Sequence, residues 1–471
     1  MLFCSVAFLL FFPTVCVLYF LLPQRFRSLL LLAAGYACYA AAERWAVIFL
    51  LLTTLVTWVG GDLLHDASGD GAKVKRSAGF FCLIAAVGLL AYFKYVPYVL
   101  SLLGKGEVSI LLPAGISFYT FQSLTYLMDC YRKECRPQKD FVKYALFVSF
   151  FPTILSGPIA RAKNLLPQFD EEHSFDTLRA KEGLALMLWG YFLKMVIADR
   201  LAILTDLVYG DVNMRGLSVL IAVFAYSFQI YCDFAGYSYI AIGCAKIMGF
   251  SLPVNFARPY LATCVQAFWR RWHISLSSWF RDYLYIPLGG NRKGKVRKYI
   301  NIMIVFVVSG IWHGANLTYL FWGFLHGIYQ VIGGVITGIV PAAGSKRSGV
   351  LRIVKIAGTF LLMSFTWVFF RAPSVTEAFG ILSRLGGPYL RALSDGTLFT
   401  LGLGVKNLVF VLAALVILIA ADLGCERKNC DVDGLLAGVK WPARWAVYYT
   451  LIIMILLSCN LSTQEFLYMK F

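Results

Sequence analysis

The chain has 471 residues, of which 59% are apolar and 14% are charged, and its formal net charge is +18 at pH 7. An ordinary soluble domain is about 45–50% apolar and about 25% charged, so the composition excludes a soluble globular protein and indicates an integral membrane protein. The positive charge does not indicate nucleic-acid binding, because the basic residues lie in short runs between apolar segments, as they do in the loops of membrane proteins.

The first apolar segment, residues 1–27, lacks both a basic leader region and a small-residue cleavage site. It therefore predicts a retained membrane helix rather than a removable signal peptide. Apolar runs close to the ~20 residues that span a bilayer recur along the rest of the chain. The long runs cover residues 2–22, 45–64, 78–102, 184–208, 217–248, 351–370, 404–424 and 444–461. The shorter or interrupted runs cover residues 28–42, 108–129, 141–159, 299–312 and 315–339.

These runs predict an all-α polytopic membrane protein with about eleven transmembrane helices, together with re-entrant and interfacial helices. Segment 147–160, FVSFFPTILSGPIA, contains two prolines and a glycine inside an apolar region. Non-helical backbone at membrane depth is tolerated only where protein or a water-filled cavity surrounds it, so we expect this segment to be re-entrant. No polar stretch is long enough to be an interdomain linker, and we expect residues 1–471 to form a single domain.

The basic loops predict the orientation of the chain in the membrane. Lysines and arginines gather at residues 25–27, 73–76, 132–139 and 292–298, and the last of these loops is the densest. Because loops rich in lysine and arginine remain on the cytoplasmic side, we expect these loops to be cytoplasmic and the N-terminus to lie outside.

Residues 266–327 contain three of the five histidines, His273, His313 and His326. Treated as one helix, residues 265–286 carry an aromatic stripe that starts at Trp272, a polar stripe that ends at Asp282, and His273 on a third face. Two interpretations remain open. The segment is either an interfacial helix with aromatic anchors or a helix that lines a substrate path.

His313 follows the apolar run NIMIVFVVSGIW, which ends at Trp312, and Asn316 comes shortly after it. The flanking Gly310 and Gly314 permit a close backbone approach or a helix break. An ionisable residue inside a membrane is costly and points to function. Imidazole is the side chain best suited to accept a proton near neutral pH. A structural histidine that forms a hydrogen bond between helices is the alternative.

Two further polar residues lie within apolar segments. For His326 we expect a hydrogen bond to a neighbouring helix. Asp233 lies in the segment QIYCDFAGYSYIAIG, and a buried carboxylate needs a partner. Arg271, Arg281 or a tyrosine hydroxyl could supply it. Asp233 then either locks two helices together or forms a wall of the same cavity as the histidines.

The sequence also lacks several catalytic patterns. It has no phosphate-binding loop, no G-x-S-x-G elbow, no H-E-x-x-H motif and no C-x-x-C pair, so neither a serine triad nor a metal site is expected. A histidine base without a nucleophile favours direct transfer between two bound substrates over a covalent enzyme intermediate.

Six motifs are specific enough to suggest a family: LPAGISFYTFQSLTYLMDCYR, FFPTILSGPIARAKNLLPQF, YCDFAGYS, NFARPYLAT, FWRRWHISLSSWFRDYLYIPLGGNRKG and SGIWHGANLTYLFWGFLHG. With them the chain resembles the membrane-bound O-acyltransferase (MBOAT) family, in its bacterial alginate O-acetylase (AlgI-like) branch. The start MLFCSVAFLLFF and the closing EFLYMKF also match, so the resemblance extends nearly end to end. One departure is Tyr239, which stands where the family usually has an acidic residue.

The resemblance implies an MBOAT fold around a central tunnel. It assigns the catalytic histidine to His313 and the second active-site histidine to His273, and both are expected to line that tunnel. Supporting or substrate-binding roles are expected for Trp272, Asp282, Trp312, Asn316 and Asp233.

The resemblance also implies the substrates. A cytoplasmic acyl thioester, acetyl-CoA in this branch, would be the donor, and the phosphates of CoA would suit the basic loop 292–298. An outer-face acetyltransferase partner would then place the acetyl group on a polysaccharide. No bound cofactor or metal is expected, and the expected location is the bacterial cytoplasmic membrane.

Two alternatives stay open. Within the family, the chain could transfer D-alanine from a carrier protein to teichoic acid. Outside it, a transporter or flippase could use the intramembrane histidines and Asp233, which composition and topology fit equally well. Consumption of a thioester distinguishes an acyltransferase from a transporter.

Overall fold

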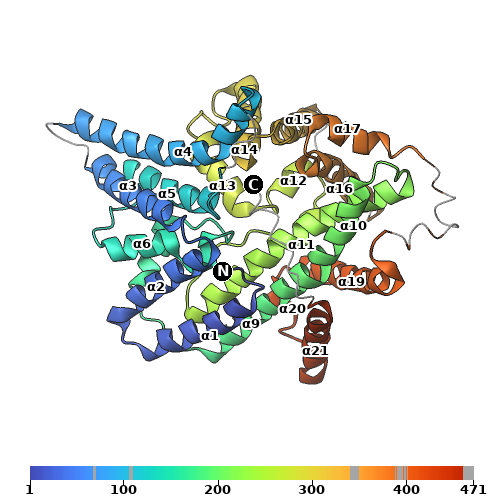
Figure 1. Cartoon of the computed structure of the whole chain (residues 1–471), viewed down its shortest axis with the longest axis horizontal. Coiled ribbons are helices and arrows are strands. Elements are labelled where there is room, and N and C mark those ends of the chain that lie inside the picture. Colours follow the sequence, from blue (N-terminus) through green and yellow to red (C-terminus); the bar gives the residue numbers. More distant parts are fainter. Residues whose placement is uncertain are drawn as a thin grey trace. The chain divides into compact units, whose positions relative to one another are not determined.

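The computed structural model describes residues 1–66, 71–105, 110–339, 349–387 and 401–459, with the single residues 389, 396 and 399. Within these ranges the chain is helical and contains no β-strand (Figure 1). The expected all-α polytopic fold is therefore confirmed. The closing motif EFLYMKF, residues 465–471, lies outside the described residues.

The chain forms two compact units. Unit 1 comprises Met1–Gly190 and Tyr237–Val254, and unit 2 comprises Tyr191–Gly236 and Asn255–Leu467. Helix α11 (Leu217–Met248) contributes its first part to unit 2 and its last part to unit 1. The prediction that residues 1–471 act as one functional domain stays a prediction.

Unit 1 is built around a central helix that is buried along most of its length. This helix is α5, and it packs against α3, with α4 beside both (Figure 1). Close packing requires a glycine at Gly61, where a Cβ atom would lie 2.3 Å from the ring of Tyr126. The helices of unit 1 before α11 are α1 Val6–Leu21, α2 Gln24–Ala42, α3 Val47–His65, α4 Ala72–Leu102, α5 Ile116–Tyr131, α6 Phe141–Ser149, α7 Phe151–Ile154, α8 Ala162–Leu165 and α9 Thr177–Tyr191.

The segment expected to be re-entrant is broken and buried. Helix α6 ends at Ser149, Phe150 leaves the helical conformation, and the four-residue α7 follows with Pro152 in its first turn. Residues 150 and 151 are fully buried, and a Cβ atom on Gly157 would lie 2.3 Å from the carbonyl oxygen of Pro152. The irregular backbone is thus enclosed by protein, as the segment's prolines and glycine predict.

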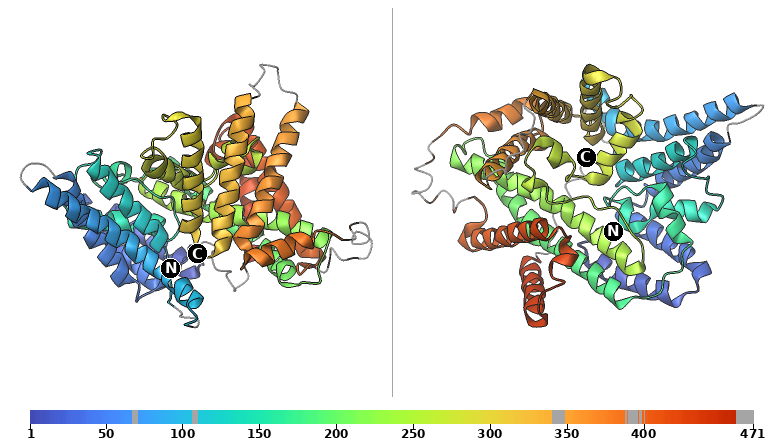
Figure 2. Two further views of the ribbon diagram at one scale, coloured as in Figure 1. Left: turned by 90° about the horizontal axis from the view of Figure 1, so that it is seen from above. Right: turned by 180° about the vertical axis from the view of Figure 1, so that it is seen from behind.

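Unit 2 contains the segments that carry His273, His313 and His326. Helices α14, α15 and α16 run side by side (Figure 2). The described helices of unit 2 are η2 Phe192–Ala198, α10 Asp199–Gly210, the first part of α11, α12 Val265–Trp269, α13 Ile274–Phe280, η4 Arg281–Tyr285, α14 Gly294–His313, α15 Leu317–Ile339, α16 Gly349–Arg371, α17 Val375–Ser383, α19 Gly404–Lys428, α20 Val432–Leu435 and α21 Trp441–Ser458. Segments η2 and η4 are π-helical.

The hairpin formed by α14 and α15 is the tightest helix pair in unit 2. A Cβ atom on Gly310 would lie 2.3 Å from the carbonyl oxygen of Tyr319, and one on Gly323 would lie 2.3 Å from that of Phe306. The two backbones therefore approach each other through glycines, as expected for Gly310 from its place in the sequence. This contact fixes the end of α14, where His313 lies.

Seven helices within the described ranges are long and apolar enough to cross a membrane, where about eleven were expected. They are Val47–His65, Ala72–Leu102, Leu217–Met248, Leu317–Ile336, Gly349–Arg371, Gly404–Lys428 and Trp441–Ser458. The difference has local causes. Helix α1 has only 16 residues, the run at 141–159 is broken at Phe150, and the run at 184–208 is interrupted by the π-helix and four charged residues.

The prediction of one continuous helix over residues 265–286 is wrong. Helix α12 ends at Trp269 and α13 begins at Ile274, with a break between them. Residues on either side of His273 form hydrogen bonds with a distant segment instead of continuing the helix. The aromatic and polar stripes of the sequence consequently do not share one helix.

Candidate functional site

His273 lies at the break between α12 and α13 in a left-handed backbone conformation, with φ +44° and ψ +54°. This conformation is uncommon outside glycine and asparagine. The Ala257 N–H donates to the Arg271 carbonyl at 3.0 Å, and the Ile274 N–H donates to the Asn255 carbonyl at 2.9 Å. These bonds hold the strained residue from both sides, so the position of His273 is set by tertiary contacts rather than by a helix.

The ring of His273 is enclosed by aromatic side chains. The ring of Phe234 meets it edge-on with a centroid distance of 4.6 Å, and the ring of Trp312 lies 6.4 Å away. The residue is only 1% exposed. Burial lowers the pKa of His273 to about 3, so its imidazole is neutral at physiological pH.

His313 is the last residue of α14, and it is 3% exposed. The indole of the preceding residue, Trp312, lies 4.8 Å from its ring. The ring of Trp322 on α15 and the ring of Phe370 on α16 meet His313 edge-on, at 5.0 and 5.2 Å. Trp312 is thus a neighbour of both His273 and His313, so two histidines predicted for the site share one aromatic neighbour.

His326 lies in the same cluster. It is fully buried on α15, and its ring lies 4.7 Å from that of Trp322. Its Nδ1 accepts a hydrogen bond from the indole N–H of Trp269 at 3.3 Å, which confirms the predicted link to a neighbouring helix. The α14–α15 hairpin brings His326 and His313 together on Trp322, although one continuous helix would have pointed them in different directions. We refer to His273, Trp312, His313, Trp322 and His326 as the histidine cluster, and all of it lies in unit 2.

Asp233 has a lysine partner, which was not among the partners expected from the sequence. Its carboxylate lies 2.6 Å from the ammonium of Lys194, which also lies 2.8 Å from Asp199. Lys194 and Asp233 are buried, and η2 turns the lysine toward the neighbouring helix. The two carboxylates offset the free-energy cost of burying the lysine charge. The triad thereby joins η2 and α10 to α11.

The other predicted supporting residues divide into two groups. Trp272 is buried and packs against Trp367 of α16 with a centroid distance of 4.8 Å. Trp367 in turn stacks on Trp322, so Trp272 supports the histidine cluster indirectly. Asp282 pairs with its neighbour Arg281 at 2.8 Å in η4. Asn316 caps α15 by accepting from the Thr318 N–H at 3.1 Å. The Asn316 amide also donates to the Pro373 carbonyl, which ties the start of α15 to the segment after α16.

The cluster is suited to moving a proton in a dry environment. Its imidazoles lie among indole and phenyl rings, where electrostatic interactions are stronger than in water. A metal is not needed to explain the arrangement, and no group of three or more histidine, cysteine or acidic residues in the described ranges could hold one.

The sequence-based interpretation missed three parts of the surroundings. Lys194 stands within an apolar run, and that position was a usable signal, because a membrane-embedded lysine needs an acidic partner. Trp269 and Trp322 were hidden among several tryptophans with no feature that set them apart. Glu426, which contacts the segment that carries His273, is too far along the chain for any spacing rule to find.

Comparisons with known proteins show the family of the chain. A model of the membrane-bound O-acyltransferase family matches residues 136–372. The probable alginate O-acetylase AlgI of Pseudomonas syringae pathovar tomato is 38% identical over 92% of this chain and 86% of its own length. The peptidoglycan O-acetyltransferase of Helicobacter pylori is 36% identical over 65% of this chain and 64% of its own length. The teichoic acid D-alanyltransferase of Streptococcus thermophilus is 30% identical over 62% and 71%. The whole histidine cluster lies within the matched region.

Proposed function

Because the chain belongs to the membrane-bound O-acyltransferase family and is thus a multi-pass membrane acyltransferase, we propose that its acyl group is acetyl. In this proposal, acetyl-CoA supplies the group on the cytoplasmic side, and the protein passes it across the membrane for O-acetylation of an extracellular or cell-wall polysaccharide. The observation that carries the proposal is the buried cluster in which His273 and His313 flank Trp312.

The proposed chemistry is a direct transfer with His313 as general base. An acceptor hydroxyl oxygen attacks the carbonyl carbon of the thioester, and neutral His313 removes the hydroxyl proton. The new C–O bond forms, the C–S bond breaks, and the proton then passes to the departing thiolate. His273, which is neutral because it is buried, orients the reactants or assists the thiolate. Exclusion of water and fixed positioning supply further acceleration.

The length of α14 sets a requirement on the donor. The basic loop 292–298 lies at the start of this helix and His313 is its last residue. At ~1.5 Å per residue, the helix separates the two by roughly 28 Å along its axis. A donor whose phosphates bind the basic loop needs a long flexible arm to bring its thioester to His313. CoA has such an arm, and so does a carrier protein with a phosphopantetheine group.

The names of the relatives support the proposed acceptor. Two of them are named for O-acetylation of alginate or peptidoglycan, and this supports a polysaccharide acceptor. We place the protein in the bacterial cytoplasmic membrane, with the tunnel expected for the family leading to its outer face. There an acetyltransferase partner would receive the group and complete its transfer.

The test is the variant His313→Ala in membranes supplied with acetyl-CoA labelled in the acetyl group. Loss of a general base lowers the rate by about 10²–10⁴-fold, and we expect a loss of that size in labelled glycan. His65→Ala is the matched control, since His65 is a half-exposed residue of unit 1 whose partner is Asp66. Glycan labelling that persists at the wild-type rate in His313→Ala contradicts the role of His313.

The same membranes distinguish the alternatives. A D-alanyltransferase would consume an aminoacyl carrier protein and leave acetyl-CoA untouched, and one relative carries that name. A transporter would move its substrate without consuming any thioester. The relative named alginate O-acetylase aligns with more of the chain than the D-alanyltransferase does, 92% against 62%, and this favours acetyl.

A further inference from the structure

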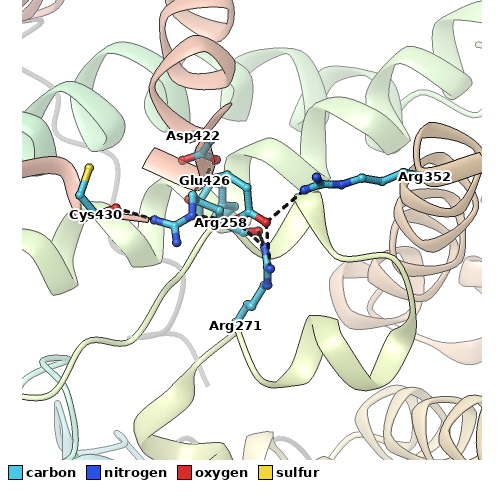
Figure 3. Close-up of polar contacts among 7 residues, drawn as sticks. Arg258, Arg271, Arg352, Asp422, Glu426 and Cys430 are labelled. Atoms are coloured by element: carbon cyan, nitrogen blue, oxygen red, sulfur yellow. Dashed lines mark hydrogen bonds and ion pairs between the residues drawn. The ribbon is translucent and has the colours of Figure 1, made fainter. Parts of the chain in front are cut away.

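Glu426, near the end of α19, is the meeting point of three arginines from two other segments (Figure 3). Arg271 binds both of its carboxylate oxygens at 3.1 Å. The Arg258 Nε lies 3.2 Å from one oxygen and the Arg352 guanidinium lies 3.2 Å from the other. Such charge-assisted and bidentate hydrogen bonds are strong and geometrically specific. Glu426 is mostly buried, with its side chain 19% exposed.

Two of these arginines stand at the two ends of one segment, residues 258–271, which leaves and returns to the same place and includes the short helix α12. We refer to it as the 258–271 loop. Residues before and after this loop pair with each other, since Ala257 donates to the carbonyl of Arg271. A guanidinium nitrogen of Arg271 also points to the carbonyl of Arg258 at 3.4 Å. Glu426 therefore joins the two ends of the loop from a helix 155 residues further along the chain.

The 258–271 loop leads directly into the histidine cluster. His273 is two residues beyond Arg271, and its left-handed backbone is held by the pairing that begins at this loop base. Inside the loop, Trp269 donates its indole hydrogen bond to His326. A displacement of the loop base would reach His273 first, because the pairing that holds its backbone begins at Arg271.

The charges at the loop base need compensation. Arg258 and Arg271 are like charges brought close together, and the carboxylate of Glu426 lies between them. The nearby Asp422, one helical turn earlier, is within 3.4 Å of the Tyr231 hydroxyl. The guanidinium of Arg258 additionally donates to the carbonyl of Cys430 at 2.9 Å, which ties it to the chain just after α19. Without the charge of Glu426, Arg258 and Arg271 would repel each other and the loop base would open.

We propose that Glu426 is a positioning residue for the transfer reaction, which clamps the base of the 258–271 loop and so holds His273 in its strained, buried conformation. The catalytic part of this statement rests on the proposed function. The structural part does not, because it concerns only where the ring of His273 lies. Arg352, which is 55% exposed and comes from α16, is not needed for the clamp.

The test uses Glu426→Gln in the full-length protein in membranes, with diethyl pyrocarbonate as the probe and mass spectrometry to follow each histidine. We expect the modification rate of His273 to rise about tenfold, as for a local opening of the structure. The rates of His313 and His326 should stay unchanged. In the acetyl-transfer assay, kcat should fall about tenfold or more, while KM for acetyl-CoA stays within about twofold because the donor site is intact.

Two further variants make the result decisive. Arg352→Gln is the matched control and should leave His273 as protected as in the wild type. Arg271→Lys keeps the charge but loses the bidentate contact. It should expose His273 to an intermediate extent, and it serves as the test if Glu426→Gln does not fold.

The proposal is overturned if His273 stays protected in Glu426→Gln, if all three buried histidines gain reactivity together, or if Arg352→Gln behaves like Glu426→Gln. The labelling result is independent of the donor. A wild-type protein that does not use acetyl-CoA would refute the proposed function and leave the clamp untouched.

Discussion

His273 and His313, which are 40 residues apart in the chain, both have the indole ring of Trp312 as a neighbour, at centroid distances of 6.4 and 4.8 Å. One of them ends a long helix and the other lies at a break between two short ones. The indole of Trp312 therefore separates two imidazoles that come from different parts of unit 2. The relationship makes Trp312 the first residue to vary.

Replacement of Trp312 by alanine should uncouple the positions of the two histidines. The indole is 6% exposed, and its removal leaves a cavity into which either ring can move. A misplacement of about 1 Å can cost about 10²-fold in rate, so we expect a loss of that order in acetyl transfer. Trp312→Phe keeps an aromatic spacer and should retain most of the activity. Equal losses in both variants would show that the spacer is not what matters.

The stability of the protein should depend on pH through His273. Burial lowers its pKa to about 3 in the folded protein, whereas the unfolded chain takes up the proton near pH 6.5. Between these values the unfolded state binds more protons, so stability falls as the pH drops from 6.5 toward 3. Each pH unit in this window costs up to ~1.4 kcal/mol.

His273→Asn removes this contribution and keeps the left-handed backbone, which asparagine tolerates. We expect the free energy of unfolding in mixed micelles to fall less steeply below pH 6.5 in this variant than in the wild type. His65→Asn, at a half-exposed position, should retain the wild-type slope. Identical slopes in wild type and His273→Asn would mean that the imidazole is not buried as described.

The glycine contact in the α14–α15 hairpin predicts a large effect from a small change. Gly310→Ala places a Cβ atom 2.3 Å from the carbonyl oxygen of Tyr319, so the two backbones must separate. Overpacking of this kind costs about 1–3 kcal/mol, and it should also reduce activity because His313 ends the same helix. Gly358→Ala on α16, where no atom lies within 4 Å of the added Cβ, should be neutral or slightly stabilising. Thermal unfolding of the two variants in detergent measures the difference.

The buried triad predicts unequal effects for its members. Lys194→Met leaves two carboxylates, Asp199 and Asp233, without the cation between them. Breaking a buried ion pair in this way costs about 3–5 kcal/mol. Asp233→Asn should cost much less, because Lys194 still pairs with Asp199 and the triad loses its excess negative charge. If Asp233→Asn is as destabilising as Lys194→Met in a denaturation experiment, Asp199 does not share the lysine.

His313 could be proposed as a functional residue from the sequence, because ionisable groups in apolar runs are rare and expensive. The link from His326 to another helix follows from the same rule, whereas the role of His273 comes from the family resemblance. Their mutual arrangement did not follow. Helical periodicity predicted an unbroken helix through His273, but hydrogen bonds to residues 255–257 override the local preference. The angle between His313 and His326 was likewise set by the turn between two helices.

Contacts between residues that lie far apart in the chain could not be predicted from the sequence. Asp233 was expected to pair with an arginine near residue 271 or 281, yet its cation, Lys194, lies 39 residues earlier. Glu426 is 155 residues from Arg271. The periodicity of apolar residues describes one helix at a time, so it contains no information about either contact. The apolar runs gave the fold class correctly, and they predicted more spanning helices than the seven that are long and apolar enough within the described residues.

The distance in sequence between Arg271 and Glu426 has a consequence for biosynthesis. The ribosome makes the His273 segment first and reaches Glu426 only 155 residues later, after roughly 8 to 30 s at usual translation rates. Until α19 enters the membrane, the arginines at the base of the 258–271 loop lack their carboxylate. Under the proposed clamp, the His273 segment therefore reaches its final position only after α19 has been inserted.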